Sequence, residues 1–63
     1  MDAFKDRLRQ IRKERNLTQR QVAEAINTIE QNYQRYERGT QQPTLLTLIA
    51  LADFFDVSLD YLC

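Results

Sequence analysis

Apolar residues near the N-terminus recur at helical spacing. Phe4, Leu8 and Ile11 follow one another at intervals of four and three residues, which places them on one face of an α-helix. Asp2 stands just before this run, where a short acidic side chain can accept hydrogen bonds from free backbone N–H groups. Asn16 tolerates the left-handed conformation that ends many helices. The pattern predicts a first helix that begins after Asp2 and ends near Asn16.

A second helix is predicted from Thr18 to about Ile26. Thr18 precedes Gln21 by three residues, a spacing typical of a capping box, in which each side chain bonds the backbone N–H of the other residue. Val22, Ala23 and Ile26 would form its buried side. Their short side chains would allow a neighbouring helix to approach closely.

A third helix is predicted directly after the second. Asn27 can end the second helix in the left-handed conformation. Thr28 and Gln31 repeat the capping-box spacing, so we expect the third helix to begin at Thr28. Gly39 is the only glycine of the chain and supplies a stop after it. The apolar positions of this helix recur at intervals of four and three: Ile29, Tyr33 and Tyr36.

The remaining chain predicts a long apolar helix and a short final one. Thr44 caps the fourth helix, which reaches about Phe55. Asp56 and Val57 then turn the chain, and Ser58 caps one last helical turn or two. A second apolar line lies opposite the core stripe of the fourth helix. That core stripe is expected to contain Leu45, Leu48, Leu51, Ala52 and Phe55.

Composition agrees with a small all-α fold. The 63 residues allow one domain, spanning 1–63, and one Gly and one Pro in the whole chain favour helices over a turn-rich sheet. The formal net charge is zero, but residues 1–38 hold all nine Lys and Arg with six of the nine acids, whereas 39–63 hold only acids. Such polarity can orient the N-terminal part toward a polyanion, although an ordinary solvated surface explains it equally well.

The sequence shows no pattern typical of a catalytic, metal-binding or cofactor-binding site. There is no histidine, and Cys63 is the only cysteine, so neither a disulfide nor a Cys/His zinc site can form within one chain. No glycine-rich phosphate loop is present. We therefore expect no enzyme and no cofactor. No apolar run approaches the roughly 18 residues of a membrane span, and we expect a cytoplasmic protein without a membrane partner.

The second and third helices together form a two-helix unit over about residues 18–38. One outward face of the third helix carries amides and guanidinium groups almost exclusively. Gln, Asn and Arg are the side chains whose paired donors and acceptors match adenine and guanine in the major groove. A polar outward face is also common on any surface helix, so the pattern favours DNA binding without deciding it.

Five short sequence pieces resemble a known family. In order they are Leu17-Thr18-Gln19, Val22-Ala23, Tyr36-Glu37-Arg38-Gly39, Pro43 with Leu48, and Val57-Ser58-Leu59-Asp60. Over about residues 4–62 they resemble the Cro/C1-type helix-turn-helix family of phage repressors and bacterial regulators, also called the XRE family. The resemblance implies a compact five-helix, lambda-repressor-like fold. It also implies that the third helix, about residues 29–37, enters the major groove of double-stranded DNA.

The resemblance assigns roles to individual positions. Arg35 is the expected main base contact, because a guanidinium can bond O6 and N7 of guanine together. Glu30 is equally well explained as a favourable charge in the first turn of the helix. The residues expected to contact bases are Glu30, Gln31 and Arg35. Those expected to contact the DNA backbone are Thr18, Gln19, Thr28, Asn32, Arg38, Thr40 and Gln42.

The resemblance also implies a buried ion pair between Arg12 and Glu37, which we interpret as structural. Asn27 and Asp56 stand where the family usually has glycine, and both residue types can adopt the left-handed conformation. Tyr33 replaces an aliphatic residue, and we expect its ring to be buried, with the hydroxyl either seeking a partner or reaching out beside the DNA. A role in the core is favoured over a DNA contact.

An exposed apolar surface is expected on the last two helices. Such a surface favours a homodimer, which would set two recognition helices about 34 Å apart, one turn of B-DNA, on a palindromic operator. Covering by a further C-terminal domain would explain the surface equally well. The expected interface residues are Leu46, Ala50, Phe54, Leu59 and Tyr61.

The sequence therefore predicts a bacterial or phage-encoded transcriptional regulator, with repression as the expected effect. The alternative is a protein-interaction domain, such as an antitoxin-like adaptor, on the same scaffold, because a fold does not fix a function. Neutral net charge and a loop 40–42 without lysine keep this alternative open.

Overall fold

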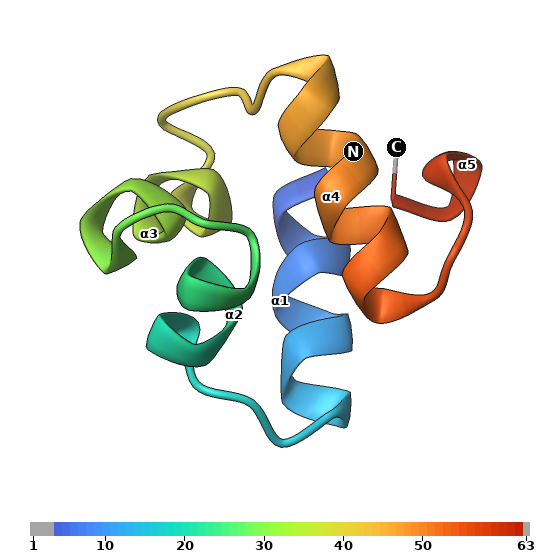
Figure 1. Ribbon diagram of the computed structural model, residues 1–63, viewed down its shortest axis with the longest axis horizontal. Helices are drawn as coiled ribbons and strands as arrows, with labels where there is room; N and C mark the ends of the chain where they lie inside the picture. The colour runs from blue at the N-terminus through green and yellow to red at the C-terminus, as the bar shows by residue number, and fades with distance from the viewer. Residues whose placement is uncertain (1–3, 63) are drawn as a thin grey trace.

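The computed structural model describes residues 4–62 and contains five α-helices (Figure 1). The helices are α1 (Phe4–Glu14), α2 (Gln19–Ala25), α3 (Glu30–Arg38), α4 (Leu45–Phe55) and α5 (Leu59–Leu62). Residues 4–62 contain no β-strand, and the expected all-α five-helix class is confirmed. The helix cap expected at Asp2 lies outside the described residues.

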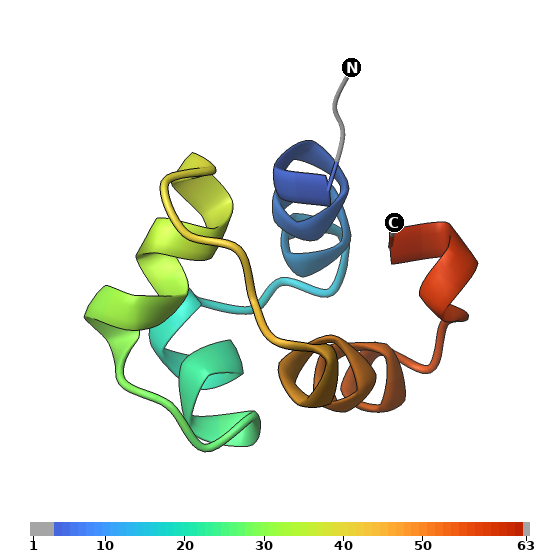
Figure 2. The same ribbon diagram turned by 90° about the horizontal axis from the view of Figure 1, so that it is seen from above.

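The helices surround one apolar core. α1 and α4 lie in the middle, with α2 and α3 on one side and α5 on the other (Figures 1 and 2). Phe4, Leu17, Ile26 and Val57 are partly buried and pack against this core. No helix within 4–62 has the length and apolar character needed to cross a bilayer. The buried apolar residues, all in one cluster, are Leu8, Ile11, Val22, Ala23, Tyr33, Tyr36, Leu51, Ala52, Phe55 and Leu62.

The first four helices end in the same way. After each helix one residue adopts a positive φ, and the next residue donates its N–H to the carbonyl five positions back. This geometry satisfies carbonyl groups that a helix end would otherwise leave free. All four left-handed residues were expected from the sequence. They are Asn16 (φ 58°), Asn27 (φ 65°), Gly39 (φ 80°) and Asp56 (φ 58°).

The start of α2 forms the expected capping box, but the start of α3 does not. Thr18 Oγ1 accepts from Gln21 N at 3.0 Å, and Gln21 Oε1 accepts from Thr18 N at 2.8 Å. The second capping box, expected for Thr28 and Gln31, is wrong. Thr28 N donates to Ala23 O at 2.9 Å, so Thr28 belongs to the end of α2. α3 therefore begins at Glu30, with Ile29 as its N-cap and no side-chain cap.

Two apolar residues that were expected in the core are exposed. Tyr33 and Tyr36 are buried as expected, with ring centroids 6.4 Å apart in edge-to-face geometry. Ile29 is 66% exposed because it lies at the N-cap, before the helical register that buries the tyrosines. Leu45 is 65% exposed, because the first turn of α4 extends beyond the N-terminal end of α1 (Figure 1). The periodicity was thus wrong at the first residue of each of these two patterns.

The C-terminal helices follow the remaining predictions. Thr44 Oγ1 accepts from Thr47 N at 3.2 Å and caps α4. Ser58 Oγ accepts from Tyr61 N at 3.1 Å and caps α5. Leu48 is only half-buried, so the core stripe of α4 narrows to the buried residues of its second half. Those residues are Leu51, Ala52 and Phe55.

Candidate nucleic-acid interface

A helix-turn-helix unit is formed by α2 and α3, which pack against each other across the turn 26–29. Val22 and Ala23 of α2 and Tyr33 and Tyr36 of α3 are buried in the shared core. Three polar residues of α3, Gln31, Arg35 and Arg38, are consequently turned outward. The unit therefore presents one short polar helix on a rigid support.

The outward face of α3 carries three exposed side chains. Gln31, Arg35 and Arg38 follow one another at intervals of four and three residues and are all exposed, so they share one face of the helix. Glu30 is half-buried in the first turn, where its charge is favourable toward the helix dipole. All of these residues were singled out from the sequence, and α3 brings them to one surface.

Asn32 connects the start of α3 to its buried face. Its Nδ2 donates to Thr28 Oγ1 at 2.9 Å and to Tyr36 Oη at 3.0 Å. Asn32 and Thr28 are half-buried. Both amide hydrogens of Asn32 are therefore engaged within the protein, whereas the Thr28 hydroxyl keeps its own proton to donate.

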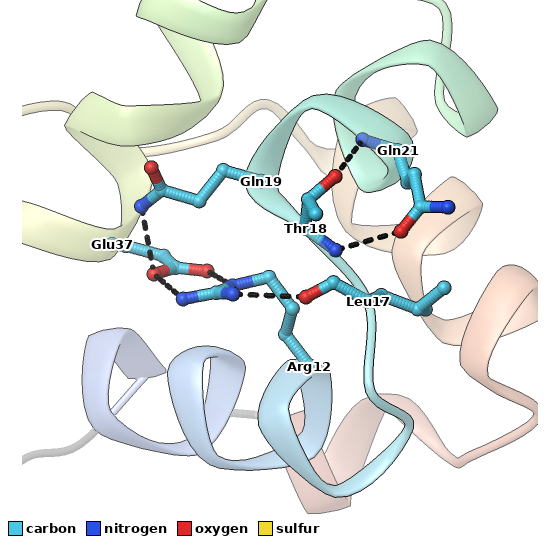
Figure 3. A network of polar contacts seen from close by, with 6 residues as sticks. All are labelled: Arg12, Leu17, Thr18, Gln19, Gln21 and Glu37. Carbon is cyan, nitrogen blue, oxygen red and sulfur yellow. Dashed lines mark hydrogen bonds and ion pairs between the residues drawn. The ribbon is translucent and has the colours of Figure 1, made fainter.

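A polar network joins three helices beside the start of α2 (Figure 3). Arg12 Nε donates to Glu37 Oε2 at 2.6 Å, and Arg12 Nη2 donates to Glu37 Oε1 at 3.1 Å. The side chains of Arg12 and Glu37 are only 13% and 3% exposed. Arg12 Nη1 also donates to Leu17 O at 3.0 Å. The expected ion pair is present, two-pronged and largely buried.

Gln19 extends this network to the surface. Its Nε2 donates to Glu37 Oε1 at 3.1 Å, so the amide group is fixed between α2 and α3 (Figure 3). The amide nitrogen has two hydrogens, and the second remains available. Sequence analysis did not predict this contact, because Gln19 and Glu37 are 18 residues apart on different helices.

The network keeps Glu37 ionised. Burial alone would raise the pKa of Glu37, but the hydrogen bonds that it accepts, above all from Arg12, hold its pKa below the ordinary value. The hydrogen bond to Glu37 raises the pKa of Arg12. Both partners therefore keep their charges at neutral pH.

Tyr33 lies deep in the same region. Its hydroxyl is buried without a hydrogen bond of ordinary geometry, and burial, together with nearby Glu37, raises its pKa well above the ordinary value. The hydroxyl that was expected to seek a partner therefore stays neutral and inside the protein. Tyr33 contributes to packing and does not reach the surface.

The loop after α3 is polar and exposed. Thr40 and Gln42, expected to contact the DNA backbone, are both exposed, as is Gln41 between them. Thr40 N donates to Arg35 O at 3.1 Å, which holds the start of the loop against the end of α3. Thr18, at the start of α2, is exposed as well.

A second surface, on α4 and α5, is apolar. Leu46 is 79% exposed, and Ala50 is half-buried. Sequence analysis missed the exposed Ile49 and assigned Leu45 to the core. The reason is that α4 is apolar on nearly all sides, so its sequence does not indicate which side packs against the other helices. We call the half-buried Ala50 and the exposed apolar residues of these two helices the α4–α5 apolar surface. Its exposed members are Leu45, Leu46, Ile49, Phe54, Leu59 and Tyr61.

Relatives of known sequence are all named as regulators. The chain is 39% identical over 59 residues to the uncharacterized HTH-type transcriptional regulator YqaE of Bacillus subtilis, covering 94% of this chain and 51% of YqaE. It is 41% identical over 60 residues to the cryptic phage CTXphi transcriptional repressor RstR of Vibrio cholerae, covering 95% of this chain and 54% of RstR. The chain thus spans about half the length of these relatives.

Solved structures share the fold. A transcriptional regulator from Listeria innocua has a TM-score of 0.90 and 33% identity, over 95% of this chain and 56% of that one. The P22 c2 repressor, solved in complex with a synthetic operator, has a TM-score of 0.92 and 24% identity, over 98% of this chain and 94% of that one. A helix-turn-helix family model matches residues 8–62. The chain belongs to the helix-turn-helix family of the Cro/C1 type.

Proposed function

We propose that this protein binds double-stranded DNA in a sequence-specific manner, with α3 in the major groove. The observation that carries the proposal is the single exposed face of α3 formed by Gln31, Arg35 and Arg38. These side chains lie on a helix whose other side is locked into the core. Fixed amide and guanidinium donors on an exposed helix match the edges of bases in the major groove.

Base contacts come from the first two turns of α3. Arg35 pairs with O6 and N7 of a guanine, and Gln31 pairs with an adenine. Glu30 accepts from a cytosine amino group or serves only the helix dipole. Ile29, exposed at the N-cap, offers an apolar group suited to a thymine methyl.

Backbone contacts surround this face. Gln19 is held by Glu37 and keeps one amide hydrogen for a phosphate oxygen. Asn32 can donate to a phosphate only if one of its two internal hydrogen bonds opens. The remaining proposed backbone contacts are Thr18, Thr28, Arg38, Thr40 and Gln42.

A homodimer on a palindromic operator completes the proposal. The α4–α5 apolar surface supplies an interface through Leu46, Ala50, Phe54, Leu59 and Tyr61. A neutral chain gains little from general attraction to DNA, so two recognition helices on one operator would provide the affinity that one lacks.

We propose that the regulatory role is repression, exerted in the bacterial cytoplasm. Residues 1–63 act as a single binding domain, without catalysis or a cofactor. RstR is named a repressor, whereas another relative, BcrR of Enterococcus faecalis with 34% identity over 94% of this chain and 29% of BcrR, is named an activator. A reporter gene carrying the selected site across its promoter separates these effects. Reduced expression supports repression, and increased expression contradicts it.

Selection of bound sequences from random duplex DNA tests the function. We expect a defined site that binds less tightly as salt rises, because phosphate contacts release counterions. Arg35→Ala should relax the preference at one base position, by about 1–3 kcal/mol. Arg7→Ala is the matched control: Arg7 donates to Tyr61 O in α5, away from α3, so its removal should leave the base preference unchanged.

Two outcomes would contradict this proposal. If the chain binds no duplex even at low salt, the DNA-binding function fails and the protein-interaction role remains. If Arg35→Ala and Arg7→Ala give the same selected sequence as the unaltered chain, Arg35 makes no base contact.

A further inference from the structure

A lysine from the first turn of α1 lies over the end of α3. A methyl group added to Gly39 would lie 2.8 Å from Cδ of Lys5, so the aliphatic part of the Lys5 side chain packs directly on this glycine. Only the Cε methylene separates Cδ from the ammonium nitrogen. The N-terminal end of α1 lies beside the C-terminal end of α3 in both views (Figures 1 and 2).

Gly39 makes this approach possible. Its φ of 80° lies in the left-handed region, and the space where a side chain would begin is taken by Lys5. Glycine therefore serves both the backbone turn and the close contact. The contact brings together two segments that are far apart in the sequence.

Lysine is not needed there to end the helix. A cation near a helix C-terminus is often explained by the free carbonyl groups. Here Arg35 O already accepts from Gly39 N at 3.0 Å and from Thr40 N at 3.1 Å, and Tyr36 O accepts from Gly39 N at 3.3 Å. The hydrogen bonds that Lys5 could make to these two carbonyls are thus already supplied by the backbone.

The neighbouring loop lacks a charge of its own. Residues 40–42 are Thr, Gln and Gln, all exposed, and the exposed Arg38 precedes them. Lys5 adds a second cation at this point, on the side of α1. Glu37 is turned inward to Arg12, so its carboxylate does not offset these charges at the surface.

We propose that Lys5 binds a DNA phosphate beside loop 40–42 and supplies from α1 the cation that this loop lacks. The inference rests on the proposed DNA-binding function, because only a bound duplex brings a phosphate to the loop. A lysine is suited to this task, since its ammonium acts as a point charge on a flexible stem. Lys5 thereby extends the binding surface beyond the helix-turn-helix unit.

Salt dependence of binding tests the role of Lys5. We would titrate a mixed-sequence duplex with the full chain and with Lys5→Gln, Lys5→Arg and Lys13→Gln. Losing one phosphate contact should reduce the slope of log affinity against log salt by about 0.9 per protomer. The affinity of Lys5→Gln for the duplex should therefore fall about threefold less than that of the unaltered chain between about 50 and 200 mM salt.

The other two variants are controls. Lys5→Arg keeps the charge and should keep the slope. Lys13 is exposed and lies eight residues further along α1. Lys13→Gln therefore removes one positive charge, as Lys5→Gln does, but at the other end of the helix. We expect Lys13→Gln to alter the slope less than Lys5→Gln does.

Each remaining outcome overturns the inference in a distinguishable way. Equal slopes for Lys5→Gln and Lys13→Gln would show that only net charge matters. A lower free energy of unfolding for Lys5→Gln, with an unchanged slope, would make Lys5 a structural residue. If the unaltered chain binds no duplex, the proposed function itself fails, and the role of Lys5 fails with it.

Discussion

The two sides of the molecule place polar and apolar groups in opposite ways. On the α2–α3 side, the carboxylate of Glu37 is buried in a hydrogen-bonded network, and uncharged amides with arginines form the surface. On the α4–α5 side, large apolar residues such as Leu46 and Phe54 are exposed. The α2–α3 side is held together by contacts within the chain. The α4–α5 side can bury its apolar surface only against another molecule or segment.

Charged residues are also distributed unevenly along the chain. Every lysine and arginine lies in residues 1–38, and the chain after them carries only Asp53, Asp56 and Asp60. These three aspartates are exposed. A polyanion is therefore disfavoured beside these three aspartates, which suits the proposed contact with DNA through the opposite, α2–α3 side.

Breaking the buried pair should have the largest effect. Arg12→Ala leaves the buried Glu37 carboxylate without its main partner and should lower the free energy of unfolding by about 3–5 kcal/mol. Urea unfolding followed by helical circular dichroism measures it. Arg7→Ala, which removes an exposed contact with Tyr61, should cost less than about 1 kcal/mol. Equal losses of unfolding free energy in the two variants would show that the pair of Arg12 and Glu37 stabilises the fold no more than an exposed contact does.

Acid should weaken the same side of the molecule. The pKa of Glu37 is lower in the folded chain than its ordinary value, so its contribution to stability is full above the ordinary pKa of about 4.3 and is lost as pH falls through the folded value. The gap in unfolding free energy between the unaltered chain and Glu37→Gln should therefore shrink with falling pH. A gap that stays constant from pH 7 to acid would contradict the ionised role of Glu37.

Changing the apolar surface should have a smaller effect, and on assembly alone. Leu46→Gln removes an exposed apolar side chain and should weaken the proposed dimer by about 1.5–3 kcal/mol for each buried leucine. The unfolding free energy of the monomer should stay within about 0.5 kcal/mol. Analytical ultracentrifugation measures the association. A monomer at high micromolar concentration for the unaltered chain would remove the dimer from the proposal.

Local signals in the sequence predicted much of the fold. Thr18, Thr44 and Ser58 cap helices as expected, because a cap involves the three or four residues that follow it. The left-handed residues Asn27 and Asp56 were identified for the same reason. Thr28 has the same spacing as Thr18 but does not cap α3, because its N–H belongs to the end of α2. Such interactions lie within a few residues of one another, so the sequence alone contains them.

Interactions between distant residues were harder to predict. The exposure of Ile29 depends on where α3 begins, and the exposure of Leu45 depends on how far the neighbouring helix extends; periodicity contains neither. The hydrogen bond between Gln19 and Glu37 depends on the packing of α2 against α3. The ion pair of Arg12 and Glu37 was expected only through resemblance to a family, since no spacing rule joins residues 25 positions apart.

The repeated ending of the first four helices has a kinetic consequence. Because each left-handed residue closes its helix through hydrogen bonds to the preceding turn, the helix limits depend on residues that are close together in the sequence. α2 then packs against α3, and α4 against α5, so many partners are neighbours along the chain. Proteins dominated by such local contacts fold in microseconds to milliseconds. We expect a chain built in this way to bury its core leucines, Leu8, Leu51 and Leu62, soon after synthesis, with little time for them to aggregate.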